Sequence, residues 1–151
     1  MNLWNKIRDA ATSASADLKG RVSRFNNSKF KDAVMAICAL MASADGTIKP
    51  EEKRKTIACI GSLDALQSFD AKELKTLFEA HCDAIADDVD IGRINALRAV
   101  AKIAGKGEET SSALEVALVI ANSDGEFAPE EKDMFKQICR TLKVNAADYG
   151  V

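Results

Sequence analysis

Apolar residues recur every three or four positions along most of the chain, a spacing that predicts amphipathic α-helices. The first 25 residues show the pattern, with Leu3, Ile7, Leu18 and Val22 on one predicted face. Alternating β-branched residues, which would indicate strands, are almost absent, and the chain has two prolines. We therefore predict an all-α fold of about seven helices, covering residues 2–24, 29–43, 50–61, 70 to the acidic cluster at 87–90, 91–104, 109–122 and 129–142.

Residues that favour helix starts stand at several of the predicted boundaries. Ser28 follows a break in the pattern and is able to cap the second helix. Asp70 and Glu73 have the spacing of a capping box at the fourth helix. Pro50 and Pro129 suit a first helical position, because the N–H that proline lacks would have no partner there. The starts of four helices are thus predicted independently of the hydrophobic pattern.

One twelve-residue motif occurs twice, as ASADGTIKPEEK at 42–53 and ANSDGEFAPEEK at 121–132, with seven identical positions. In each copy an apolar helix ends at Asp-Gly and Pro-Glu-Glu-Lys opens the next helix. Two copies 79 residues apart are too few and too distant for a solenoid. We expect two similar helix-turn-helix halves related by a pseudo-twofold axis. They lie in a core domain at 29–151, which follows a basic amphipathic N-terminal helix at 1–28.

The motif has a structural interpretation and a ligand-binding one. Asp-Gly supplies a turn, Ile48 and Phe127 fill the joint, and paired glutamates complement the dipole of the following helix. The spacing also resembles the second half of an EF-hand loop. Met41 and Ile120 stand at the first ligand position, however, and neither side chain can coordinate a cation. The motif is therefore not an EF-hand.

The two copies could form a cation site together, although neither is an EF-hand alone. A pseudo-twofold axis between the two halves would bring their carboxylates close to one another. Clustered carboxylates repel one another unless a cation or a basic partner neutralises them. Oxygen ligands of this kind select calcium, magnesium or manganese over zinc or copper. The predicted metal ligands are Asp45, Glu52, Asp124 and Glu131, with Glu51, Glu130 and Glu126 as additional acidic partners.

Charge is distributed unevenly. Residues 1–31 carry seven Lys or Arg and two Asp, a net charge of +5, whereas residues 32–151 carry 14 bases and 21 acids, a net charge of −7. A basic amphipathic helix can lie on an anionic membrane or a partner, or can pack its stripe on its own bundle. Nucleic-acid binding is not expected, because Trp4 is the one aromatic residue in the predicted basic helix at 2–24 and the rest of the chain is acidic. The predicted membrane or partner surface comprises Trp4, Lys6, Arg8, Lys19, Arg21 and Arg24.

Other candidates for chemistry are weaker. Cys38, Cys59, Cys82 and Cys139 have no CxxC spacing and stand at apolar helical positions, which is typical of reduced core thiols; a soft-metal or redox role is the alternative. His81 is the only histidine, so a three-histidine zinc site is impossible. No apolar run approaches 18 residues and no signal-peptide core is present, so we expect a cytoplasmic protein.

The chain resembles the tellurite-resistance protein TerB family. The resemblance rests on the two copies of Ala-x-x-Asp-Gly-x-apolar-x-Pro-Glu-Glu-Lys and on the start Asn-Leu-Trp-Asn-Lys-Ile-Arg-Asp, and it covers essentially the whole chain. It implies an all-α fold with two similar halves and a role in bacterial resistance to tellurite and other stresses. It also implies a membrane partner of the TerC type, calcium-binding TerD-like partners, and a divalent-metal site at Asp45, Glu52, Asp124 and Glu131.

These observations together predict a non-enzymatic stress-response protein. We expect it to bind divalent cations, calcium before magnesium or manganese, or partner proteins, through its acidic residues. The expected location is a complex at the inner face of the membrane, which the protein contacts peripherally. A metal-dependent hydrolase and a purely structural interaction module without metal are the alternatives.

Overall fold

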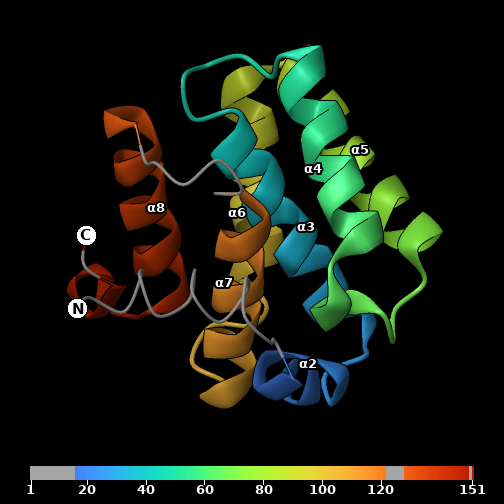
Figure 1. Cartoon of the computed structure of the whole chain (residues 1–151). Helices are drawn as coiled ribbons and strands as arrows, with labels where there is room; N and C mark the ends of the chain where they lie inside the picture. The colour runs from blue at the N-terminus through green and yellow to red at the C-terminus, as the bar shows by residue number, and fades with distance from the viewer. Residues whose placement is uncertain (1–15, 122–127, 150) are drawn as a thin grey trace.

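The structure is a computed structural model that describes residues 16–121, 128–149 and 151. These residues form seven α-helices and two short 3-10 helices and contain no strand, which confirms the predicted all-α class (Figure 1). The elements are α2 (Ala16–Ser23), α3 (Ser28–Ala42), α4 (Pro50–Ser62), η1 (Asp64–Leu66), α5 (Ala71–Asp87), α6 (Val89–Ala101), α7 (Glu108–Ala121), α8 (Pro129–Leu142) and η2 (Ala146–Tyr149).

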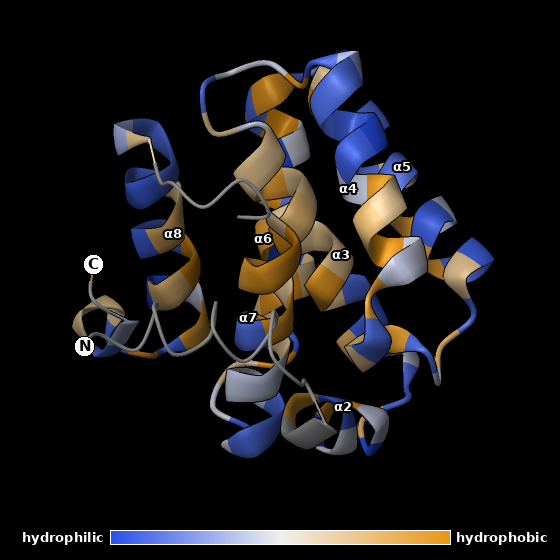
Figure 2. Cartoon of the chain, in the orientation of Figure 1, coloured by the Kyte–Doolittle hydropathy of each residue, from blue (hydrophilic) through white to orange (hydrophobic). Residues whose placement is uncertain are grey.

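Helix α3 is the centre of the core. Every residue from Ala33 to Met41 is buried, so no side of the helix over this stretch faces water. A helix that is apolar all round must be enclosed by others, and α5, α6 and α7 pack around it. Figure 2 shows the same contrast, with apolar residues along α3 and α7 and polar residues over the outer faces of α4 and α8.

The two helix pairs that carry the repeated motif contact each other reciprocally. Helix α3 packs on α7, α4 contacts α7, and α8 contacts α3. The two joints, α3 to α4 and α7 to α8, therefore belong to one packed unit. The exact pseudo-twofold relation between the halves stays a prediction.

Helix α2 is joined to the core rather than separate from it. It packs on η1 and α7 (Figure 1), and Leu18 and Val22 are buried in the same apolar cluster as α3. Residues 1–15, including the apolar positions Leu3 and Ile7, lie outside the described residues. The predicted division into 1–28 and 29–151 therefore stays a prediction. No helix in the described part of the chain combines the length and apolar character needed to cross a bilayer.

Two of the predicted capping groups differ in detail, and α6 and α7 begin at Val89 and Glu108 rather than at 91 and 109. Asn27, not Ser28, caps α3: its Oδ1 accepts a hydrogen bond from the N–H of Phe30 at 2.9 Å, and Ser28 is already helical. Asp70 caps α5 as predicted, through the N–H of Lys72 at 3.0 Å. Glu73 pairs with Lys31 of α3 at 2.8 Å, and this tertiary ion pair takes the carboxylate that would complete the capping box.

Candidate binding pocket between the two motifs

The first copy of the motif forms a tight turn in which Asp45 has a structural role. Gly46 has a φ of +98°, which side-chain-bearing residues rarely adopt. Its N–H donates to the carbonyl of Ser43 at 2.8 Å. Asp45 Oδ1 accepts a hydrogen bond from the N–H of Thr47 at 3.1 Å. One carboxylate oxygen of a predicted metal ligand therefore holds the turn.

An arginine from a distant helix fixes the start of this turn. Arg93 Nη2, on α6, donates a hydrogen bond to the carbonyl of Ser43, just after the last residue of α3. Ser43 itself is fully buried. A cationic group at a helix C-terminus satisfies a carbonyl and complements the helix dipole. The contact anchors the loop that presents Asp45.

In the second copy of the motif, Glu131 rather than the Asp-Gly aspartate has the structural role that the structure describes. Glu131 Oε1 accepts a hydrogen bond from the N–H of Ala128 at 3.0 Å, which caps the start of α8. Pro129 occupies the first turn, as predicted. Residues 122–127 lie outside the described residues, and with them the predicted ligand Asp124, the acidic partner Glu126 and the apolar Phe127.

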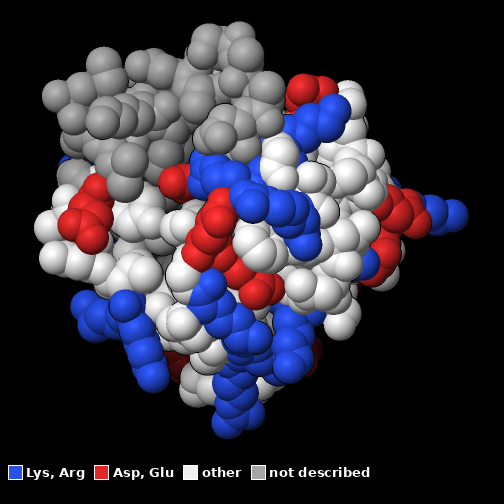
Figure 3. All heavy atoms as spheres, turned by 90° about the horizontal axis from the view of Figure 1, so that it is seen from below, with Lys and Arg blue, Asp and Glu red and all other residues white. Residues whose placement is uncertain are grey.

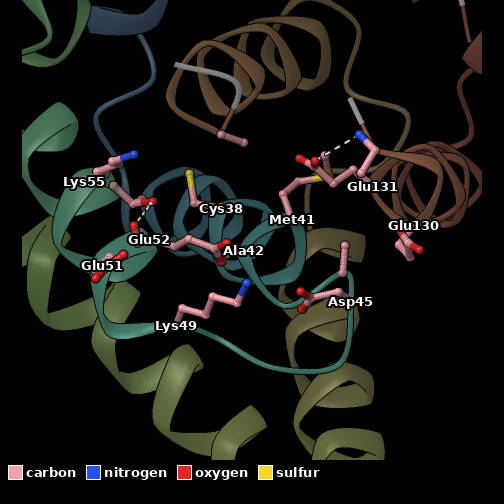
Figure 4. Close-up of a pocket in the computed structure, with 14 residues that line it drawn as sticks. Cys38, Met41, Ala42, Asp45, Lys49, Glu51, Glu52, Lys55, Glu130 and Glu131 are labelled. Carbon is pink, nitrogen blue, oxygen red and sulfur yellow. Dashed lines mark hydrogen bonds between the residues drawn. The ribbon is translucent and has the colours of Figure 1, made fainter. Parts of the chain in front are cut away.

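Both copies line one pocket of about 380 Å³ (Figure 4). Asp45 stands at the end of the first turn, and Glu52 and Lys49 extend from the α4 side toward the middle of the pocket. Glu131 lies beside Met41. Of the seven acidic residues predicted to act together, the pocket thus brings together the five that are described: Asp45, Glu51, Glu52, Glu130 and Glu131.

These carboxylates surround the pocket without meeting at one point. Among residues 16–121 and 128–149, no three His, Cys, Asp or Glu side chains are grouped so that they could hold a metal ion. Glu130 points outward from the pocket. Because Asp124 is outside the described residues, the complete four-ligand set stays a prediction.

The pocket floor is apolar and contains a neutral thiol. Cys38, Met41 and several alanines line it beneath the charged rim. Cys38 is 1% exposed. Burial raises the pKa of its thiol far above the ordinary value, so the thiolate form is not available at neutral pH. Cys82 and Cys139 are also buried and Cys59 partly so, which agrees with the predicted core thiols.

Sequence reasoning missed two cations in this pocket. Lys49 and Lys55 line it together with the carboxylates. A signal was present in the sequence, because Glu52, Lys55 and Thr56 are spaced by three and four residues and share one face of α4. The buried Thr56 hydroxyl donates to the carbonyl of Glu52 at 3.0 Å, which marks the same face.

The described part of the predicted basic surface is largely paired within the fold. Arg21 forms an ion pair with Glu115 of α7 at 2.5 Å, Arg24 pairs with Glu108, and Lys19 Nζ donates to Gln67 at 3.3 Å. Figure 3, which views the molecule from the side of α2, shows acidic groups among the basic ones. Trp4, Lys6 and Arg8 lie outside the described residues.

Comparison with known proteins places this chain in a family. A family model described as "Tellurite resistance protein TerB" matches residues 31–150, which include both copies of the motif. A tellurium resistance protein TerB from an Alcaligenes species is 29% identical over 118 residues, covering 78% of this chain and 97% of that protein. No solved structure matches the chain. The family match spans most of the chain, so the protein belongs to the tellurite resistance protein TerB family and is associated with tellurite resistance.

Proposed function

We propose that the protein is a non-enzymatic binding module whose acidic pocket takes a divalent cation or a partner protein. The observation that supports this most directly is that both copies of the motif line one pocket, with Asp45 and Glu52 from the first and Glu131 from the second. The chain belongs to a non-catalytic tellurite-resistance family, which supports the non-enzymatic part of the proposal.

Calcium is the proposed cation, ahead of magnesium and manganese. Calcium accepts six to eight oxygen ligands in flexible geometry, whereas magnesium demands near-ideal octahedral coordination. The proposed ligands come from two separate loops, and calcium is the ion that tolerates the irregular geometry of such a set. In this proposal Asp45, Glu52 and Glu131 act with Asp124, and water completes the coordination.

The structural roles of Asp45 and Glu131 are compatible with ligand binding. Each carboxylate offers about four acceptor sites, and the hydrogen bonds from Thr47 and Ala128 use one oxygen of each. A carboxylate that is already oriented by a backbone N–H loses little freedom when it binds a cation. The motif therefore serves as a joint and as a ligand-bearing loop at once.

Thermal unfolding with increasing calcium, magnesium or manganese tests the cation site. Free ligand at 100 times its dissociation constant stabilises the native state by about 2.7 kcal/mol, which corresponds to a rise in Tm of roughly 5–10 °C for a domain of this size. The double variant Asp45→Asn, Glu131→Gln keeps the acceptor oxygens and removes two charges, so it should fold and lose the rise.

Asp83→Asn with Asp87→Asn is the matched control, because both residues are exposed on α5 and neither lines the pocket. It should respond to the cations like the unmodified chain. A Tm that stays constant with all three cations would remove the cation site from the proposal.

We further propose that the basic N-terminal region places the module beside a membrane protein of the TerC type at the inner face of the membrane. Deleting residues 1–28 would remove the buried Leu18 and Val22, so the test uses Lys6→Gln with Arg8→Gln. We expect the full chain to sediment with vesicles of anionic lipid and this variant to sediment less. Lys72→Gln with Lys75→Gln, on the exposed side of α5, is the matched control. Equal sedimentation of all three proteins would exclude the membrane contact.

A further inference from the structure

The pocket between the motifs has the dimensions of a site for an organic group. Its volume of about 380 Å³ lies within the range of pockets that enclose small molecules or side chains. A calcium ion alone needs oxygens that converge to about 2.3–2.6 Å, and the described carboxylates do not converge in this way. Most of the space is therefore available to something larger than an ion.

The lining of the pocket is divided by polarity. Cys38, Met41 and Ala42 give it an apolar floor, and the charged side chains form its rim (Figure 4). An occupant that fits both parts has an apolar stem and a charged end. Arginine and lysine are the protein side chains with this construction, since their methylene stems pack on apolar surface while the charged end stays at a polar rim.

The charge of the rim favours an occupant whose charged end is positive. Glu130 points outward, and the other four carboxylates that line the pocket stand with two lysine ammonium groups, a net formal charge of −2. Carboxylates outnumber ammonium groups here, so the two lysines cannot neutralise the rim even if both lie close to it. The excess of negative charge would attract a cationic group to the pocket.

Arginine fits this rim better than lysine. Asp45 stands at one side of the pocket and Glu52 at the other, so the carboxylates approach an occupant from more than one direction. A guanidinium group presents five N–H donors in a planar fork and is less strongly hydrated than an ammonium group. It can bridge carboxylates that are too far apart to share a small ion.

We propose that this pocket binds the side chain of an arginine presented by a partner protein, with the stem on Met41 and Ala42 and the guanidinium between the two motifs. The inference rests on the proposed role of the pocket and specifies the chemistry of the partner. The arginine and a divalent cation would neutralise the same carboxylates, so each should weaken the binding of the other.

Backbone amide shifts in a ¹⁵N-labelled full-length chain test the proposal. The probe is the peptide acetyl-Ala-Ala-Arg-Ala-Ala-amide at matched ionic strength, and its control carries citrulline, which has the shape of arginine without the charge. We expect saturable shifts confined to residues 38–45, 50–56 and 128–131, with affinity at least tenfold lower for the citrulline peptide. Equal binding of the two peptides, or shifts spread over the surface, would overturn the proposal.

Variants locate the interaction. Asp45→Asn with Glu131→Gln should lower the affinity for the arginine peptide at least tenfold, whereas Asp83→Asn with Asp87→Asn should leave it unchanged. If both variants bind equally, the peptide is held by general surface charge and the proposal is wrong.

The cation titration separates this proposal from the one on which it rests. A calcium-dependent rise in Tm without binding of the arginine peptide would overturn the arginine site and leave the cation site standing. Peptide binding without any change of Tm on addition of cations would support the arginine site and exclude the proposed cation site. Calcium at saturating concentration should weaken peptide binding if both bind.

Discussion

His81 on α5 lies 2.7 Å from Asp32 on α3, measured between Nε2 and Oδ1. The contact joins the central helix to one of its covering helices, and the side chains of His81 and Asp32 are 15% and 29% exposed. The hydrogen bond from His81 lowers the pKa of Asp32, and the charges of His81 and Lys102 act in the same direction against the effect of burial. The pair is therefore a link between stability and pH.

We expect Asp32→Asn to lower the free energy of unfolding by about 1 kcal/mol at pH 7, because the partly exposed carboxylate loses a charge-assisted hydrogen bond. A depressed pKa means that the stabilisation is fully present above the unfolded-state pKa of about 3.9, begins to fall as the pH approaches that value, and is lost as the pH falls through the lower folded-state pKa. Urea unfolding between pH 7 and pH 3 should show the difference between the two proteins shrinking below about pH 5. A difference that does not shrink between pH 5 and pH 3 would contradict the assignment.

The close approach of α5 and α6 makes Gly92 the least replaceable glycine in the described part of the chain. A Cβ at this position would lie 2.5 Å from the Cα of Ile85 and 2.6 Å from the carbonyl oxygen of Ala84. These are backbone atoms that cannot rotate aside. We expect Gly92→Ala to lower the free energy of unfolding by about 2–3 kcal/mol or more, measured by urea unfolding.

Gly61→Ala is the matched control for that substitution. Gly61 lies in α4, and no atom lies within 4 Å of the position that a Cβ would take there. Alanine is the better helix former by about 0.5–1 kcal/mol. The control should therefore be neutral or stabilising. If both variants lost stability equally, crowding between α5 and α6 could not be the cause.

The cysteines differ in their access to reagents. Burial raises the pKa of the thiols of Cys82 and Cys139 to about 12, and Cys38 is fully enclosed. Cys59 is only partly buried. Because the thiolate is the reactive form, we expect N-ethylmaleimide to modify Cys59 first and the other three at the rate of unfolding.

Mass spectrometry of the labelled peptides measures this order, and Cys59→Ser should remove the early adduct. Early labelling of Cys38 would show instead that the pocket floor opens to reagents in solution.

The helices could be predicted closely because their boundaries depend on local chemistry. The last long helix begins at Pro129 and ends at Leu142, as the proline and the apolar spacing indicate. The predicted cap of α3 was wrong by one residue because Asn27 and Ser28 are both good capping residues. Only the extended backbone of Asn27, with a φ of −136°, decides between them.

The repeat indicated which carboxylates lie near one another, and their role as metal ligands stays a prediction. Two copies of one motif indicated that Asp45, Glu52 and Glu131 would share a region, and they line one pocket. The support from Arg93 depends on how α6 lies against the end of α3, 50 residues away. No local pattern encodes that contact, and none distinguishes carboxylates that surround a cavity from carboxylates that converge on an ion.

Substitutions at Asp45 separate the structural role of the motif from its ligand role. Asparagine keeps an oxygen that can accept the hydrogen bond from Thr47 but removes the charge, whereas alanine removes both. We expect Asp45→Asn to change the free energy of unfolding by less than about 0.5 kcal/mol and to weaken cation binding. Asp45→Ala should also weaken cation binding, and it should lower the free energy of unfolding by about 1 kcal/mol.

Gly46→Ala completes the comparison, because its φ of +98° is strained for any residue with a Cβ and should lower stability by about 1–2 kcal/mol while leaving every carboxylate in place. Chemical unfolding and calcium titration of the three variants give two readouts for each. If cation response follows stability across the series, the motif acts only as a joint. If Asp45→Asn loses the response at full stability while Gly46→Ala keeps it at reduced stability, the charge of Asp45 itself binds the cation, and the turn exists to present it.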